Sequence, residues 1–345
     1  MTEFDALLFV SFGGPEGPDD VIPFLENVLR GKNVPRERMM EVATHYQEFG
    51  GVSPINEQNR NLISALEAEM KVQGIELPVY WGNRNWHPMI PDTLKQMKED
   101  GHRKILMFMT SSFSSYSGCR QYREDIAVAQ QEIGDEELSF AKLRVFYNHP
   151  GFIEPSADLL SNSLSEFENP KDAHVLFTAH SIPDAMARGC RYETQLNEAC
   201  KLVAEKAGHS SYELVYQSRS GPPTQPWLEP DVCDRIEELN QEGKKNIVIA
   251  PIGFISDHME VLFDLDTEAR ELCDKLGIHM VRTPTVGTNP RFVKMICELI
   301  QERSDSSVEK SALGDLGPSH DACPINCCLS GRPGAGRPTV ASAAE

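Results

Sequence analysis

Length, composition and charge set the first limits on what this chain can do. It has 345 residues, 40% of them hydrophobic, which is enough to bury a large core and favours two domains over one. The 52 acidic side chains outnumber the 33 basic ones, and a formal charge of -19 repels the phosphates of nucleic acids and of anionic membranes. We therefore expect no nucleic-acid partner.

The start of the chain and its apolar runs bear on location. The sequence begins Met-Thr-Glu-Phe-Asp, which lacks the basic segment of a signal peptide, and no apolar run approaches the roughly 20 residues that span a bilayer. We expect a cytoplasmic protein without stable membrane insertion. The second half of the chain is followed by no additional apolar segment, which favours a monomer.

Short apolar runs alternate along the chain with longer amphipathic stretches. In the first half these patterns predict strands at 6–10, 78–81, 105–109 and 143–147, with helices at 59–73 and 93–100. In the second half they predict strands at 175–178, 214–216, 247–252 and 279–281, with helices at 195–208 and 261–277. Joined as βαβ units, the elements predict an α/β protein with two similar domains, each a four-stranded parallel sheet flanked by helices.

Composition also places the domain boundaries. A predicted strand gives way to Pro-Gly punctuation near Asn148, so we place the N-terminal domain at 1–148 and the C-terminal domain at 149–303. From about Ser304 onward the sequence is rich in Ser, Gly, Pro and Ala and too poor in apolar residues to offset its ordering entropy. We therefore predict that 304–345 is a mostly disordered tail.

Titratable residues follow two predicted strands of the second half, at the sheet edge where open parallel sheets bind ligands. His180 ends one strand, and Glu260 lies one turn into the helix after another. Asp264 and Glu268 recur after Glu260 at intervals of four residues, which would stack three carboxylates on one helix face. A histidine with a carboxylate can hold a divalent cation or remove a proton from a ligand. A structural histidine and a solvated acidic face are the alternatives.

Aromatic, hydroxyl and basic side chains near other strand ends could hold a planar ligand that carries carboxylates. We consider Arg30, Tyr46, Ser53 and Tyr122 for this part. The glycine-rich turn at 11–17 lacks the spacing of a dinucleotide or phosphate loop, so it fits either a tight turn or a backbone close to a flat ligand. Each of these residues alone is as well explained as core or surface. Their shared location favours a binding site.

At these residues the chain resembles the ferrochelatases, and most closely the soluble actinobacterial-like coproporphyrin III ferrochelatases. The resemblance covers about residues 4–302 and rests on several motifs together. They are Ser-Phe-Gly-Gly-Pro-Glu-Gly-Pro at 11–18, Phe-Gly-Gly-Val-Ser-Pro-Ile-Asn at 49–56, Gly-Asn-Arg-Asn-Trp at 82–86, Ser-Ser-Tyr-Ser-Gly-Cys-Arg-Gln-Tyr at 114–122, Thr-Ala-His-Ser-Ile-Pro at 178–183, Gln-Ser-Arg-Ser-Gly-Pro-Pro at 217–223, Pro-Trp-Leu-Glu-Pro at 226–230 and Asp-His-Met-Glu-Val at 257–261.

The resemblance implies two Rossmann-like domains of the class II chelatase kind that face each other across a porphyrin cleft. It implies insertion of Fe2+ into a porphyrin in haem synthesis, with His180 and Glu260 as metal ligands, Ser53 and Tyr122 against the porphyrin, and Asp264 and Glu268 as a path for protons or iron. Phe12 stands where some relatives carry a tyrosine that can sit axial to the metal.

Several alternatives stay open at this point. The porphyrin expected from the resemblance is coproporphyrin III, which becomes Fe-coproporphyrin III, and protoporphyrin IX is the alternative substrate. Another divalent metal, such as cobalt or nickel, could replace iron. A protein of the same architecture could also bind a metal or tetrapyrrole without chemistry.

The cysteines divide into a scattered set and a cluster near the end of the chain. Nine cysteines, an odd number in so long a chain, form no disulfide framework. Some ferrochelatases hold a 2Fe-2S cluster through one internal cysteine and three near the carboxyl terminus, which points here to Cys323, Cys327 and Cys328. Pro155 stands about where an internal ligand is found in some of those relatives. The alternative is a set of exposed, oxidation-prone thiols in a flexible tail.

Overall fold

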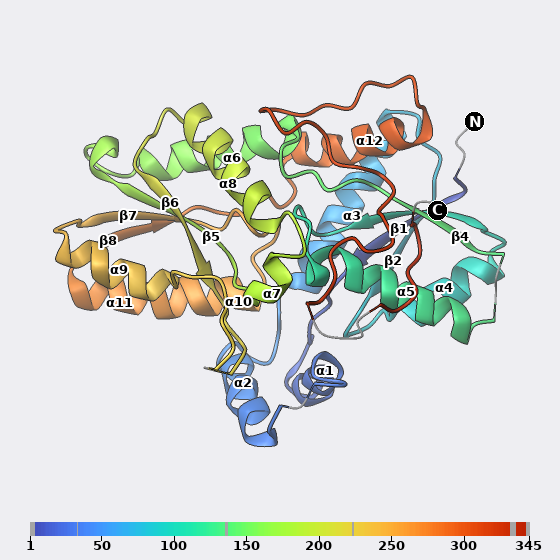
Figure 1. The fold of residues 1–345 in the computed structure, drawn as a ribbon, viewed down its shortest axis with the longest axis horizontal. Coiled ribbons are helices and arrows are strands. Elements are labelled where there is room, and N and C mark those ends of the chain that lie inside the picture. The colour runs from blue at the N-terminus through green and yellow to red at the C-terminus, as the bar shows by residue number, and fades with distance from the viewer. Residues whose placement is uncertain (1–3, 33, 135–136, 223, 332–335, 343–345) are drawn as a thin grey trace.

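The structure is a computed structural model that describes residues 4–32, 34–134, 137–222, 224–331 and 336–342. It contains two four-stranded parallel sheets, ordered β2-β1-β3-β4 and β6-β5-β7-β8, with helices packed on their faces (Figure 1). The predicted fold class, with one such sheet in each half of the chain, is confirmed. No helix in the described parts of the chain is long and apolar enough to cross a membrane.

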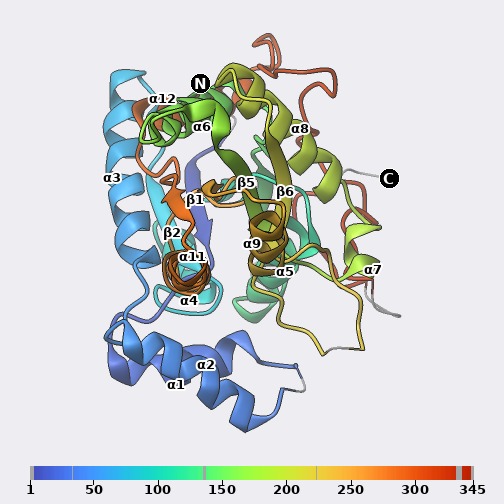
Figure 2. The same cartoon turned by 90° about the vertical axis from the view of Figure 1, so that its left-hand side faces the viewer.

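The first half builds its sheet from strands that the helices connect in parallel. Its elements are β1 (Ala6–Ser11), the 3-10 turn η1 (Pro18–Asp20), α1 (Val21–Val28), α2 (Arg36–Glu48), α3 (Ile55–Val72), β2 (Val79–Asn83), α4 (Ile90–Glu99), β3 (Lys104–Met109), the π-helical turn η2 (Tyr116–Arg120), α5 (Gln121–Glu132) and β4 (Ser139–Lys142). Helices α1 and α2 project from the body of the molecule as a separate pair (Figures 1 and 2).

The second half repeats the plan of the first. Its elements are α6 (Pro150–Leu164), the 3-10 turn η3 (Pro170–Asp172), β5 (His174–His180), α7 (Asp184–Ala187), α8 (Tyr192–Lys206), β6 (Tyr212–Gln217), α9 (Val232–Gln241), β7 (Asn246–Ala250), α10 (Met259–Val261), the π-helix η4 (Leu262–Ala269), α11 (Arg270–Leu276), β8 (His279–Arg282) and α12 (Pro290–Ser304). β8, which lies beside β7 at the edge of the sheet, is also the last strand in the chain.

One predicted strand is wrong. The apolar run at 143–147 was expected to form the fourth strand, but β4 pairs with β3 only over Ser139–Lys142. The residues that follow leave the sheet and carry Phe146 and Tyr147 into the core, where both are 1% exposed. Their hydrophobicity therefore reflects burial in a segment that crosses between the halves. A short apolar run in a sequence does not distinguish such a buried segment from a paired strand.

A continuous core joins the two halves. Phe9 and Phe108 of the first sheet belong to the same buried cluster as Val175 and Phe177 of the second. Helix α12 packs against both α3 and α6 (Figure 2), so the last helix of the second half also covers the first. Because burying one large apolar side chain contributes about 1.5–3 kcal/mol, this shared core holds the halves at a defined spacing.

The segment after α12 differs from the disordered tail that its composition suggests. In the described residues it forms no helix or strand, yet it runs along the first half and accepts hydrogen bonds from buried basic side chains there. The donors are Arg120 to the Cys327 carbonyl (3.0 Å), Arg123 to the Val340 carbonyl (2.8 Å) and Lys142 to the His320 carbonyl (3.1 Å). Buried cations need acceptors, so hydrogen bonds to the first half help to order this segment, together with the packing of Cys323 and Val340 into a hydrophobic cluster of the first half.

Candidate active site

The two central strands of the second sheet bring His180 and Glu260 together. His180 is the last residue of β5, and β7, its neighbour in the sheet, leads through a short loop to α10 and Glu260. His180 Nε2 lies 3.9 Å from Glu260 Oε1, and the two side chains are 32% and 44% exposed. Two metal–ligand bonds of about 2.1 Å each reach across up to about 4.2 Å, so one cation can bind both atoms.

Local hydrogen bonds orient the imidazole of His180. Nδ1 contacts the Ser181 carbonyl oxygen, which can only accept, so Nδ1 carries the hydrogen in the neutral ring. The lone pair is then on Nε2, which faces Glu260. The Tyr192 hydroxyl donates to the His180 carbonyl at 3.1 Å and holds the strand end from beneath. The ring therefore presents a base or a metal ligand to the acid.

A second histidine supports the glutamate. His258 caps the start of α10, and its Nδ1 accepts a hydrogen bond from the Glu260 amide at 3.2 Å. Burial lowers the pKa of His258, with the nearby charge of Glu260 acting in the opposite direction. Because a lowered pKa keeps the ring neutral at neutral pH, Nδ1 retains the lone pair that accepts the hydrogen bond from the Glu260 amide and holds that backbone in place.

Asp264 continues the acidic series inward from Glu260. Burial raises its pKa to about 7, and the charges of Glu260 and Glu268 raise it too, while hydrogen bonds from Ser218 and Gln217 oppose the shift. Gln217 donates to both the Glu260 carbonyl and Asp264 Oδ2, each at 3.2 Å. Asp264 therefore exchanges a proton near neutral pH, about one helical turn from Glu260.

The spacing of the three acids suggested one face of a regular α-helix, but they do not lie on one. Glu260 belongs to α10, whereas Asp264 and Glu268 belong to η4, whose hydrogen bonds follow the π-helical pattern between residues five apart. The two remain close enough that Glu268 raises the pKa of Asp264. Burial raises the pKa of Glu268 as well, and His45 of α2 opposes this shift.

Helices of the first half cover this acidic series. His45 stacks on Phe263 with ring centroids 3.9 Å apart, and Gln58 of α3 exchanges two hydrogen bonds with the Asp257 backbone, at 3.1 and 2.9 Å. Tyr46 is held by Phe24 in an edge-on contact, and the charge of Glu260 adds to burial in raising the pKa of Tyr46. The site is thus shared between the two halves of the chain.

The other residues expected at the porphyrin spread over a wider area. Ser53 is 4% exposed and its amide donates to the Pro15 carbonyl at 2.9 Å. A Cβ on Gly14 would meet Ser53 at 2.7 Å, so the glycine-rich turn serves close packing here. Tyr122 is 5% exposed, lies under the Arg84 guanidinium at 5.0 Å and has its pKa raised to about 12 by burial. Arg30 is exposed and contacts Asn27 near the end of α1.

Sequence reasoning missed part of the site. Gln217 and Ser218 bind Asp264, yet the Gln-Ser-Arg run after β6 received no role although it follows a strand end. Ser218 has a φ of 62°, an uncommon conformation for a residue with a side chain, and its hydroxyl points at the Asp264 carboxylate. Position after a strand was the available signal.

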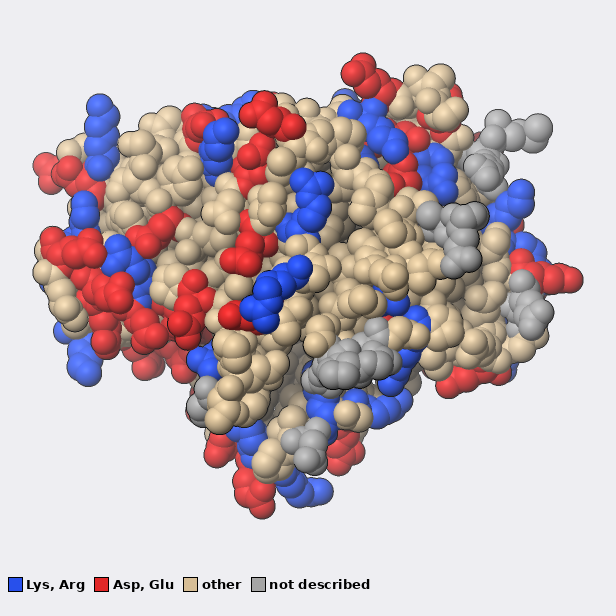
Figure 3. All heavy atoms as spheres, in the orientation of Figure 1, with Lys and Arg blue, Asp and Glu red and all other residues tan. Residues whose placement is uncertain are grey.

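Acidic side chains also gather on the surface of the second half. Figure 3 shows them on the side of the molecule formed by α9 and α11, which carry Asp234, Glu237 and Glu238, and Glu271 and Asp274 respectively. A surface of this charge raises the local concentration of divalent cations near the domain that holds His180 and Glu260.

Comparison with known proteins identifies the family. The family model described as ferrochelatase matches residues 4–304. A ferrochelatase of Rhodopirellula baltica is 60% identical over 331 residues, 95% of this chain and 94% of that one. A coproporphyrin III ferrochelatase of Streptomyces coelicolor is 49% identical over 364 residues, 99% of this chain and 96% of that one.

Solved structures give the same fold at low sequence identity. SirB from Bacillus subtilis with Fe3+ matches with a TM-score of 0.52 and 13% identity, over 90% of this chain and 100% of that one. The likeness supports the arrangement of two parallel sheets described above. On the strength of the family model and the close relatives, the chain belongs to the ferrochelatase family.

Proposed function

We propose that this protein inserts Fe2+ into coproporphyrin III, with His180 and Glu260 handling the metal and the pyrrole protons. The observation that carries the proposal is the approach of Nε2 to Oε1 at 3.9 Å in a chain of the ferrochelatase family. Relatives named coproporphyrin III ferrochelatases at 49% and 48% identity support the choice of porphyrin.

The chemistry requires two pyrrole N–H protons to leave, water to leave Fe2+, and the macrocycle to bend so that nitrogen lone pairs face the metal. The unprotonated Nε2 of His180 suits the first task, since it accepts a proton within reach of the Glu260 carboxylate. Glu260 offers an oxygen ligand to iron as water departs. The cleft walls supply the bending by strain on the bound porphyrin.

Asp264 and Glu268 carry protons away from the pair in this proposal. A proton that reaches His180 or Glu260 passes to Asp264, whose pKa of about 7 matches neutral pH. Gln217 joins the Glu260 backbone to Asp264 and keeps the two acids at a fixed spacing. Glu268, with His45 beside it, receives the proton next. The same acids serve iron on entry.

The first half holds the porphyrin. Tyr46 lies close enough to the pair for the charge of Glu260 to raise its pKa. Ser53, just before α3, and Tyr122, in the first turn of α5, orient the ring, and the exposed Arg30 suits a propionate carboxylate. We assign 1–148 to porphyrin binding and 149–303 to metal handling, and we treat 304–345 as a C-terminal tail. We also propose that the protein works as a cytoplasmic monomer.

We further propose that Cys323, Cys327 and Cys328 hold a 2Fe-2S cluster. Cys323 and Cys328 are 1% and 3% exposed, and Cys327 Sγ lies 3.4 Å from Cys328 Sγ. Buried thiols that contact one another suit iron ligation, which replaces each S–H by an Fe–S bond. When bound, such a cluster would supply a reducible iron centre and would cross-link the three cysteines of the tail.

Side-by-side turnover tests the proposed reaction. Purified protein is given anaerobic Fe2+ with coproporphyrin III or with protoporphyrin IX, and Co2+ and Ni2+ compete in parallel. We expect coproporphyrin III and Fe2+ to give the highest kcat/KM. Faster metallation of protoporphyrin IX would overturn the substrate, preference for another metal would overturn iron, and binding without metallation would reduce the protein to a carrier.

A further inference from the structure

One arginine joins the two ends of the segment that carries Glu260. Arg282 is the last residue of β8, and its side chain is 14% exposed. Its Nη1 donates to Asp257 Oδ1 at 2.7 Å, and its Nε donates to Asp266 Oδ1 at 2.8 Å. Asp257 precedes Glu260 in the loop before α10, and Asp266 follows it in η4. A single guanidinium therefore holds the segment on both sides of the proposed metal ligand.

The strand that carries this arginine is fixed in the second sheet. Arg282 is the register partner of Ile249 in β7, and the Thr283 amide donates to the Ile249 carbonyl at 2.8 Å. The guanidinium also donates to the Thr283 carbonyl, through Nη1 at 3.3 Å. Because side chains on strands are placed more precisely than those on loops, Arg282 locates both carboxylates relative to the sheet that carries His180.

The same loop is held from the first half of the chain. Gln58 of α3 accepts a hydrogen bond from the Asp257 amide at 2.9 Å and donates one to the Asp257 carbonyl at 3.1 Å. The backbone of Asp257 is thus bound by the first half and its carboxylate by Arg282 of the second half. Asp257 is therefore a point at which the metal-handling segment is fixed relative to the half assigned above to porphyrin binding.

The acids of this segment divide into two groups by their partners. Arg282 forms ion pairs with Asp257 and Asp266. Glu260 lies against a histidine, and Asp264 accepts hydrogen bonds from neutral side chains. Among the residues that the structure describes, neither Glu260 nor Asp264 forms an ion pair with a lysine or an arginine. Arg282 therefore offsets the charge of the two acids that it binds and does not compete with iron for the other two.

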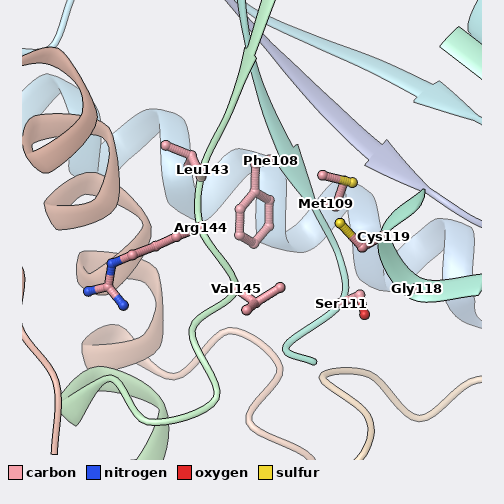
Figure 4. A pocket seen from close by; sticks show the side chains of 8 residues that line it. All are labelled: Phe108, Met109, Ser111, Gly118, Cys119, Leu143, Arg144 and Val145. Carbon is pink, nitrogen blue, oxygen red and sulfur yellow. The ribbon is translucent and has the colours of Figure 1, made fainter. Parts of the chain in front are cut away.

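A second buried arginine provides a contrast. Arg144 lines a small hollow of about 10 Å³, room for about one water molecule, and its guanidinium points away from the other labelled side chains (Figure 4). Its Nε and Nη2 bind the two carboxylate oxygens of Glu302 in α12, at 2.8 and 3.1 Å. A bidentate pair of this kind grips one acid. Arg282 divides its donors between two acids, and that arrangement sets the spacing of two points along the chain.

We propose that Arg282 is a positioning residue for iron insertion, which sets the place of Glu260 by holding Asp257 and Asp266 at a fixed spacing. The inference rests on the role of Glu260 proposed above and adds a residue that acts through Glu260 and not by contact with metal or porphyrin. Because partners of metal ligands and small displacements at a reacting centre each affect turnover on the order of ten- to a hundredfold, loss of Arg282 should lower kcat and leave porphyrin binding intact.

Matched variants of the full chain test the assignment. Arg282→Gln removes both ion pairs, whereas Arg282→Lys keeps the charge but not the fork of donors that reaches two acids. Asp257→Asn removes one ion pair and keeps the shape of the side chain. Arg270→Gln is the control, because Arg270, the half-buried residue directly after η4, donates to the Met280 carbonyl of β8 at 2.6 Å. It also ties this segment to β8, but through the main chain.

Each variant is measured alone and combined with Glu260→Gln. Rates with anaerobic Fe2+ and coproporphyrin III give kcat and KM, fluorescence titration gives porphyrin affinity, and melting temperature reports folding. We expect Arg282→Gln to lower kcat at least about tenfold with porphyrin affinity within about twofold, Arg282→Lys to lower it less, and Arg270→Gln to stay within about twofold. In the Glu260→Gln background, Arg282→Gln should cost less than about a further twofold, because residues that act as a unit lose their effect together.

A normal kcat in a folded Arg282→Gln protein would overturn the assignment. So would an equal loss on adding Arg282→Gln to Glu260→Gln, because Arg282 would then act independently of Glu260. If Arg282→Gln does not fold, Asp257→Asn decides in the same way, and its folded form with normal turnover would end the proposal. Near-normal iron insertion by Glu260→Gln alone would overturn the proposed function itself, which is a separate failure.

Discussion

The two sheets have the same strand topology, but their carboxyl edges carry different kinds of residue. At the first sheet the turn after β1 is packed against Ser53 so tightly that Gly14 has no room for a Cβ. At the second sheet the corresponding edge carries His180 and Glu260, both partly exposed and 3.9 Å apart. Duplicated architecture is compatible with the division of labour that we propose, in which one edge holds the porphyrin and the other moves metal and protons.

The largest expected effect is at the second edge. Glu260→Gln removes the carboxylate and keeps the shape of the side chain, so turnover should fall by on the order of a hundredfold while porphyrin binding survives. The double variant with His180→Ala should be little worse than either single one, because groups that act as a unit lose their effect together. Steady-state rates and porphyrin fluorescence titration measure the two quantities.

Glu271→Gln is the matched control, since Glu271 is an exposed acid of α11 on the same domain. It should leave turnover within about twofold. Equal losses in the two variants would mean that net charge, and not the position of Glu260, matters.

Asp264→Asn should have an intermediate effect that depends on pH. With a folded pKa of about 7, above the usual value, Asp264 contributes stability at low pH that is lost as pH rises from about 4 through 7. The Asn variant should therefore gain stability relative to wild type at pH 8, on the order of 1 kcal/mol, and none at pH 4. Its turnover should drop by about tenfold and lose its dependence on pH near 7.

Urea unfolding at pH 4, 6 and 8, beside rate measurements over the same range, checks this prediction. A stability difference that is constant with pH would contradict the raised pKa, and an unchanged pH profile of turnover would remove Asp264 from the proton path.

Tyr122→Phe tests the first edge. Loss of a hydroxyl that only positions the porphyrin should raise KM several-fold and change kcat little, because uniform binding energy is lost. Tyr80→Phe is the control, since its hydroxyl binds Asp100 at 2.6 Å, away from the site. A collapsed kcat at normal KM would place Tyr122 on the chemical side of the comparison.

The smallest effect concerns the contact between the two edges. Gln58→Ala removes both hydrogen bonds to the Asp257 backbone and should cost about 1 kcal/mol of unfolding free energy, with a few-fold loss of turnover. Gln47→Ala, whose amide binds Pro18 within the first half, should cost less and leave turnover unchanged. Equal turnover in both variants would show that alignment of the halves does not depend on Gln58.

The sequence predicted the two sheets, and it placed His180 and Glu260 at the same sheet edge, because both depend on local pattern. Strand ends in a parallel sheet meet at one edge, so His180 and Glu260 could be placed together without coordinates. The crossing segment with Phe146 was misassigned because burial, and not pairing, makes it apolar. The π-helix of η4 left no separate signal, since its residues also suit an α-helix.

The tail shows where local pattern fails most clearly. Its composition predicts disorder, but buried side chains such as Arg120 and Arg123 lie elsewhere in the chain and need the carbonyls that it offers. The contact between the side chains of Cys119 and Cys323 could not be predicted from the sequence for the same reason. Contacts between distant segments depend on the whole fold, and the spacing of residues along a single sequence does not predict them.

Iron insertion by a folded His180→Ala protein is the most direct test of the central claim. Turnover, porphyrin affinity and melting temperature are measured on one preparation. The account predicts normal porphyrin binding, a melting temperature close to wild type and turnover reduced by about a hundredfold or more. Near-normal iron insertion by this folded variant, or a lowered melting temperature with full activity of the folded fraction, would contradict it.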